Sequence, residues 1–93
     1  MSDPRIREEV WFSGRVQGVG FRFTVSETAR RFAVAGFVEN LVDGRVRAMV
    51  EGTAEEIERF LQAVEMEMDR YIAGVERRSE PATGEFPDFR IRH

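Results

Sequence analysis

Two apolar runs and a tight turn stand together in residues 37–51, which read FVENLVDGRVRAMVE. The dipeptide Asp43-Gly44 is typical of the turn between two antiparallel strands, so this segment predicts a β-hairpin. We expect its first strand over residues 37–41 and its second over residues 46–51. In the second strand the side chains alternate as in a sheet that buries one face, with Val46, Ala48 and Val50 against Arg47, Met49 and Glu51.

A helix is predicted directly after the hairpin. Thr53 precedes Glu56 by three residues, a spacing typical of a capping box at a helix N-terminus. One apolar face then follows at helical spacing, made of Ile57, Phe60, Leu61, Val64 and Met68. Beyond this helix, residues 75–79 are a candidate strand, residues 81–87 a loop, and residues 88–92 alternate as a short last strand.

The segment before the hairpin predicts one strand and one helix. Residues 6–13 alternate between apolar and polar side chains, as a half-buried strand does. Residues 21–34 carry an apolar stripe at helical spacing, and Gly36 is expected to end that helix. Residues 1–5 are polar, contain Pro4, and are expected to form a loose tail.

The predicted order is therefore strand, helix, strand, strand, helix, strand, strand. Two helices with one apolar stripe each, beside an alternating sheet, predict an α+β fold with both helices on one face of a mostly antiparallel sheet. The simplest plan is βαββαβ plus a short last strand. With 93 residues, the chain is expected to form a single domain over residues 1–93.

The composition excludes several classes of function. Fourteen basic and seventeen acidic residues give a net charge of −3, which argues against a basic nucleic-acid-binding surface. The sequence has no cysteine and one histidine, His93, so it offers no thiolate or histidine cluster for a metal and no cysteine nucleophile. No apolar run approaches the length of about 20 residues that a membrane helix needs. We expect a cytoplasmic monomer that binds neither nucleic acid nor a membrane.

One segment has the composition of an anion site. Residues 14–22 read GRVQGVGFR and join the first strand to the first helix. Glycines allow successive backbone N–H groups to converge on one point, and the helix N-terminus adds partial positive charge there. Arg22 in the first turn has a planar, permanently charged guanidinium that suits two phosphate oxygens. The alternative is an ordinary glycine-rich connection with an exposed arginine, and the segment is neither a Walker loop nor a dinucleotide motif.

Two motifs in this order resemble those of the acylphosphatases. Gly14 with residues 16–22, VQGVGFR, resembles the first motif of that family, and residues 36–40, GFVEN, with residues 43–46, DGRV, and Gly52 resemble the second. The resemblance runs from about Val10 to the C-terminus. It implies a ferredoxin-like α/β sandwich. It also implies hydrolysis of the carboxyl–phosphate bond of small acyl phosphates, with no metal and no cofactor.

The same resemblance implies roles for particular residues. The phosphate-binding arginine of the family corresponds to Arg22, and its water-positioning asparagine corresponds to Asn40. The backbone cradle for the phosphate corresponds to Arg15, Val16, Gln17, Gly18, Val19, Gly20 and Phe21. Glu39 departs from the family pattern, which usually has a cation or glutamine there. Because neighbours on a strand point to opposite faces, we expect Glu39 to face away from the site if Asn40 faces it.

Two other functions remain open on the sequence alone. The chain could be a ferredoxin-like module that holds an anion without turning it over. It could also be an excised acylphosphatase-like domain of a hydrogenase maturation carbamoyltransferase, although those are long chains with zinc-binding domains. Release of phosphate from an acyl phosphate distinguishes the enzyme from the anion-binding module, and the physiological acyl phosphate is left open.

Overall fold

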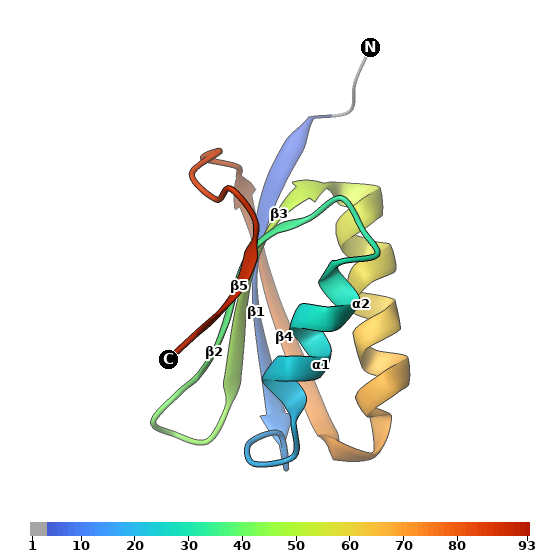
Figure 1. The fold of residues 1–93 in the computed structure, drawn as a ribbon, viewed down its shortest axis with the longest axis vertical. Helices are drawn as coiled ribbons and strands as arrows, with labels where there is room; N and C mark the ends of the chain where they lie inside the picture. The colour runs from blue at the N-terminus through green and yellow to red at the C-terminus, as the bar shows by residue number, and fades with distance from the viewer. Residues whose placement is uncertain (1–3) are drawn as a thin grey trace.

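Over residues 4–93, which the computed structural model describes, five strands form one sheet and both helices lie on one of its faces (Figure 1). The strand order across the sheet is β4-β1-β3-β2-β5. Along the chain the elements are β1 (Arg5–Gly14), α1 (Phe21–Ala29), β2 (Ala35–Asn40), β3 (Val46–Thr53), α2 (Ala54–Met68), the 3₁₀ turn η1 (Asp69–Tyr71), β4 (Ile72–Pro81) and β5 (Phe89–Arg92).

The sheet is antiparallel except at one edge. β1 pairs with β3 and β4, and β2 pairs with β3, all antiparallel. The short β5 runs parallel to β2 and forms the edge beside it. This arrangement confirms the predicted α+β fold with two helices on one face of a mostly antiparallel sheet.

The core lies between the sheet and the two helices. Alternate side chains of β1 and β3 point toward the helices, and the apolar face predicted for α2 is buried along its whole length. Burying each large apolar side chain contributes about 1.5–3 kcal/mol to stability. The largest apolar side chains with almost no exposure are Phe12, Phe21, Phe60, Ile57 and Leu61.

The predicted end of the first helix is wrong. α1 ends at Ala29, whereas the apolar stripe predicted a helix to residue 34. In residues 30–32 each N–H donates to the carbonyl three residues earlier, so the chain tightens into a turn. The turn leads to β2, whose first residue, Ala35, pairs with Glu51.

Gly36 lies inside β2 and does not end a helix. Its φ of 144° is one that side chains with a Cβ rarely adopt, and a Cβ there would stand 1.7 Å from the carbonyl oxygen of Met49. Glycine at this position therefore lets β2 and β3 approach each other closely.

The loose tail predicted over residues 1–5 is too long. Arg5 is the first residue of β1 and pairs with Thr53 across the sheet. Antiparallel pairing with β3 gives its backbone partners that no local sequence pattern reveals. Residues 1–3 lie outside the described part of the chain.

At the start of α2, one of the two hydrogen bonds of the predicted capping box forms. The Thr53 hydroxyl accepts a hydrogen bond from the Glu56 N–H at 3.2 Å. The Glu56 carboxylate instead accepts from the N–H of Ala33, at 2.9 Å, and so ties α2 to the turn before β2. Within residues 4–93, no helix has both the length and the apolar character needed to cross a membrane.

The sheet face away from the helices carries a lattice of ion pairs. The Glu9 carboxylate accepts from Arg47 at 2.6 Å and from Arg78 at 2.7 Å. Arg78 lies over the ring of Trp11, at 6.0 Å from its centroid. Every cation in this lattice is a guanidinium, because all fourteen basic residues of the chain are arginines.

Candidate active site

The glycine loop between β1 and α1 forms the floor of the candidate site. Gly18 and Gly20 have φ values of 77° and 76°, in the left-handed region that favours glycine. A Cβ at either position would meet no atom within 4 Å, so the backbone conformation, not crowding, explains the glycines. Such turns direct successive N–H groups into one concavity.

Two buried side chains hold this loop against the core. Val16 and Phe21 are almost fully buried at its two ends. The rings of Phe21 and Phe12 lie 5.0 Å apart, between centroids, so the start of α1 is packed on β1. The backbone of the loop is thus exposed while its anchors are fixed.

The start of α1 is electrostatically suited to an anion. Gly20 is its N-cap and has no side chain to accept from the free N–H groups, and the first turn contains no acidic residue. Those N–H groups have no partner within the helix, and the helix dipole adds partial positive charge. Arg22 in the same turn is half-buried and adds a full positive charge. An anion is therefore favoured at this end of the helix.

Gln17 joins the loop to the β2–β3 turn. Its Nε2 donates to the carbonyl oxygens of Leu41, at 2.8 Å, and Arg45, at 3.0 Å. Leu41 directly follows Asn40, the last residue of β2. The glycine loop and the end of β2 are thereby held side by side.

Arg22 and Asn40, the two residues predicted to act in the site, line the same cavity of about 190 Å³. Of the predicted cradle, four residues line it as well. Arg15, Gln17 and Val19 do not, and the Gln17 amide is turned to the β2–β3 turn instead. The complete lining consists of Val16, Gly18, Gly20, Phe21, Arg22, Phe23, Asn40, Ile91 and His93.

Three of the lining residues were not predicted from the sequence. Phe23 follows Arg22 in α1, and Ile91 and His93 belong to the C-terminal segment. Ile91 pairs with Val38 in the parallel edge of the sheet, which brings the C-terminal segment beside the end of β2. A parallel pairing at a sheet edge leaves no local sequence signal, so the sequence could not have predicted Ile91 and His93 as lining residues. Phe23 could have been predicted, because it directly follows Arg22 in the chain.

Glu39 faces away from the cavity, as the alternation of strand side chains predicted. Its carboxylate accepts from Arg47 at 2.6 Å on the sheet face opposite the helices. Arg47 pairs with both Glu9 and Glu39, so Glu39 belongs to the ion pairs of that face. The departure from the family pattern thus lies outside the site that Asn40 lines.

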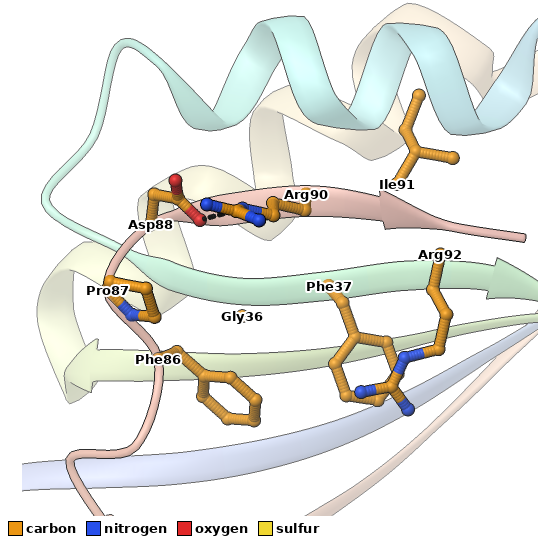
Figure 2. A pocket seen from close by; sticks show the side chains of 8 residues that line it. All are labelled: Gly36, Phe37, Phe86, Pro87, Asp88, Arg90, Ile91 and Arg92. Atoms are coloured by element: carbon orange, nitrogen blue, oxygen red, sulfur yellow. Dashed lines mark hydrogen bonds and ion pairs between the residues drawn. The ribbon is translucent and has the colours of Figure 1, made fainter.

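A larger cavity, of about 280 Å³, lies on the other side of β5 (Figure 2). In Figure 2 Ile91 points toward α1, whereas Arg92 points the opposite way, beside Phe37. The Arg92 guanidinium lies 3.6 Å from the centroid of the Phe37 ring, and Arg90 is paired with Asp88 at 2.8 Å. Neither Arg22 nor Asn40 lines this cavity, so we place the candidate site in the smaller one.

The candidate site offers no metal-binding cluster. Within residues 4–93, no group of three or more histidine, cysteine, aspartate or glutamate side chains is placed to hold a metal ion. The polar side chains in the lining are a guanidinium, an amide and an imidazole, contributed by Arg22, Asn40 and His93. This set can bind an anion and orient a water molecule.

The chain is similar to known proteins over nearly its whole length. A model of the acylphosphatase family matches residues 8–91. A protein of Synechococcus sp. (strain JA-2-3B'a(2-13)) named acylphosphatase is 44% identical over 93 residues, and the match covers 99% of this chain and 97% of that protein. A second acylphosphatase, of Syntrophobacter fumaroxidans, is 42% identical over 87 residues and is covered to 89%.

Solved structures show the same fold. The crystal structure of acylphosphatase from Bacillus subtilis superposes with a TM-score of 0.85 at 28% identity, over 95% of this chain and 99% of that one. Full-length HypF, in its phosphate- and nucleotide-bound form, superposes with a TM-score of 0.82 at 25% identity. That match covers all of this chain but 12% of HypF.

Proposed function

Because the chain belongs to the acylphosphatase family and is a hydrolase of acyl phosphates, we propose that Arg22 and Asn40 divide the work of its reaction. The loop backbone over residues 15–21 and Arg22 hold the phosphoryl oxygens. The Asn40 amide holds the attacking water. The observation that supports this division most directly is that Arg22, Asn40 and the glycine loop line one cavity.

The reaction needs mainly positioning and charge stabilisation. Water attacks phosphorus in line with the bond to the acyl oxygen, which breaks to release a carboxylate. A proton of the water passes to a phosphoryl oxygen of the substrate, so that the products are the carboxylate and inorganic phosphate. The carboxylate is a good leaving group and needs no strong general acid. The backbone N–H groups and the guanidinium stabilise the charge that develops on the phosphoryl oxygens.

The proposal is tested by measuring phosphate release from acetyl phosphate. Arg22→Gln should lower kcat and also weaken inhibition by inorganic phosphate, because the guanidinium contacts phosphate in ground and transition states alike. Asn40→Ala should lower kcat about 100-fold and leave the inhibition constant of phosphate nearly unchanged. Arg30→Gln, at an exposed position just after α1, and Gln62→Ala, on the exposed side of α2, are matched controls.

Circular dichroism must show that each variant is folded. A folded Asn40→Ala variant with normal turnover would contradict the role of Asn40 in placing the water. Equal loss of phosphate affinity in both variants would mean that Asn40 contacts the phosphate and that the division is wrong. The proposed chemistry uses no metal and no cofactor, so activity should persist after exhaustive chelation.

We further propose that the chain acts as a monomer. The loop, the helix and both strands that line the cavity come from one chain, so no second copy is needed to complete it. Sedimentation at the concentration used for the assay tests this proposal. The cytoplasmic location and the single domain over residues 1–93 stay predictions from the sequence.

A further inference from the structure

Phe23 is a large aromatic side chain that α1 leaves in solvent. It is 64% exposed, although it lines the cavity that Arg22 and Asn40 share. Its neighbours Phe21 and Val25 point into the core, and Phe23 projects from the outer side of the helix. Within residues 4–93 the exposed large apolar side chains are Val19, Phe23, Val42 and Met66. Two of these, Val19 and Phe23, belong to the loop and the helix turn that form the site.

The cavity has a strand wall and a helix wall. Asn40 ends β2, and Ile91 and His93 stand beside it, because β5 runs parallel to β2. α1 supplies the helix wall, with Arg22 and Phe23. The glycine loop, which is the proposed phosphate cradle, leads directly into the helix wall, with Gly20 as the N-cap of α1.

In-line attack gives the two walls different roles. If Asn40 holds the water on the strand wall, the bond that breaks points away from that wall. The part of the lining left for the acyl group is then the helix wall. The exposed side chain on that side is the ring of Phe23.

We propose that Phe23 is a specificity-determining residue that contacts the acyl group and favours apolar acyl phosphates, aromatic ones above all. This inference rests on the proposed function, because it takes the position of the water from Asn40. No aspartate or glutamate side chain lines the cavity, and the helix wall offers an acyl group no polar side chain besides Arg22, which the phosphoryl group occupies. An aromatic acyl group gains contact area and ring–ring attraction against Phe23, whereas an acetyl group is too small to cover the ring.

The test compares benzoyl phosphate with acetyl phosphate. Phe23→Ala should lower the ratio of their kcat/KM values about tenfold, the size of effect that a small change in apolar contact has on specificity. Phe23→Leu, which keeps an apolar side chain, should retain part of that preference. Met66→Ala removes an apolar side chain that is even more exposed than Phe23, from α2 and outside the lining of the cavity, and should keep the wild-type ratio. The two substrates differ in intrinsic reactivity, but that difference cancels when the ratio is compared between variants.

Failure of this inference is separable from failure of the proposed function. If the wild-type chain hydrolyses neither substrate, the proposed function is wrong, and the proposed contact between Phe23 and the acyl group is wrong as well. If the wild type hydrolyses both and a folded Phe23→Ala variant keeps the wild-type ratio, only the role of Phe23 is wrong. Inhibition by inorganic phosphate, which has no acyl group, reports on the cradle separately. Parallel weakening of phosphate inhibition and of both substrates in Phe23→Ala would show that the ring supports the cradle, and would overturn the inference.

Discussion

The side-chain amide of Gln17 donates to the main-chain oxygen of Leu41 over 2.8 Å. Because Leu41 follows Asn40 directly, this hydrogen bond connects the phosphate cradle to the strand end that carries the proposed water-holding amide. The same nitrogen donates to Arg45 on the far side of the turn. One side chain that need not contact the substrate therefore helps to fix the glycine loop relative to Asn40.

Replacing Gln17 should impair catalysis more than it impairs stability. Gln17→Ala removes two hydrogen bonds whose acceptors keep backbone partners within the turn, so the loss of stability should be about 1 kcal/mol. The cradle is then free to shift relative to Asn40, and kcat should fall about tenfold or more. Steady-state kinetics and thermal unfolding measure the two effects.

A charged replacement sharpens this prediction. Gln17→Glu places a carboxylate against the carbonyl oxygens of Leu41 and Arg45 and should reduce kcat further than Gln17→Ala. Gln62→Ala, an exposed amide on α2, is the control for a general effect of removing glutamine. Normal turnover in a folded Gln17→Ala variant would show that the loop keeps its place without this link.

Glu39 should be dispensable for the reaction. Its carboxylate is paired with Arg47 on the face opposite the helices, whereas the neighbouring Asn40 lines the cavity. Glu39→Gln should change kcat by less than about twofold, and the loss of the ion pair should cost at most about 1 kcal/mol of stability. Turnover of the variant with acetyl phosphate at low and at high salt provides the measurement. A large loss of kcat would mean that Glu39 acts on the substrate despite its position.

Inorganic phosphate should stabilise the folded chain. Binding to the cradle raises stability by mass action, by about 2.7 kcal/mol at a phosphate concentration 100 times the dissociation constant. For a domain of this size, the melting temperature should rise by about 15 °C. Thermal unfolding with phosphate, against chloride at equal ionic strength, gives the shift. Arg22→Gln should reduce it, and a wild-type chain without any shift would contradict the cradle.

Glu51 should make stability depend on acid pH. This carboxylate is buried in the sheet face opposite the helices, beneath the loop that follows β4. Burial alone would raise its pKa, but hydrogen bonds from the Thr83 N–H, the Arg7 guanidinium and the Gly84 N–H outweigh burial and lower the pKa from 4.5 to about 2. A carboxyl whose pKa is lower in the folded than in the unfolded chain stabilises the fold above its unfolded pKa. That stabilisation is lost as the pH falls through the interval from 4.5 to about 2.

The variant Glu51→Gln should reveal this contribution. It should unfold at a lower temperature than the wild type at neutral pH, and the difference should shrink as the pH falls below 4.5. The shift in pKa corresponds to about 3 kcal/mol when the carboxyl titrates completely. Glu55→Gln, at an exposed position in the first turn of α2, should follow the wild-type pH profile. If Glu51→Gln also follows it, the hydrogen bonds to Glu51 contribute nothing to acid stability.

Local patterns predicted much of the fold, and pairing between distant segments accounts for the differences. The Asp43-Gly44 turn and the apolar face of α2 depend on neighbours within a few residues, and both predictions are confirmed. The start of β1 at Arg5 depends on its pairing with Thr53, which no local pattern reveals. α1 ends at Ala29 because residues 30–32 form a turn, which the apolar stripe does not predict.

The candidate site shows the same contrast. That Arg22 and Asn40 share a cavity was expected only through the family resemblance, since local spacing does not relate a helix start to a strand end. Phe23 could have been predicted as a lining residue, because it adjoins Arg22 in the chain. Ile91 and His93 enter the lining through the parallel edge strand, whose partner cannot be read from its own four residues.

The lattice on the open sheet face has a chemical consequence for a protein that handles acyl phosphates. An acyl phosphate is a mixed anhydride, and it transfers its acyl group to uncharged amines as well as to water. The side-chain amine of lysine is a target of such acylation, whereas a guanidinium stays protonated in water at any ordinary pH. Because all fourteen basic side chains are arginines, the lattice around Glu9 keeps its charge in a solution of its own reactive substrate. The cations of these ion pairs are thus inert toward acylation by the substrate of the protein.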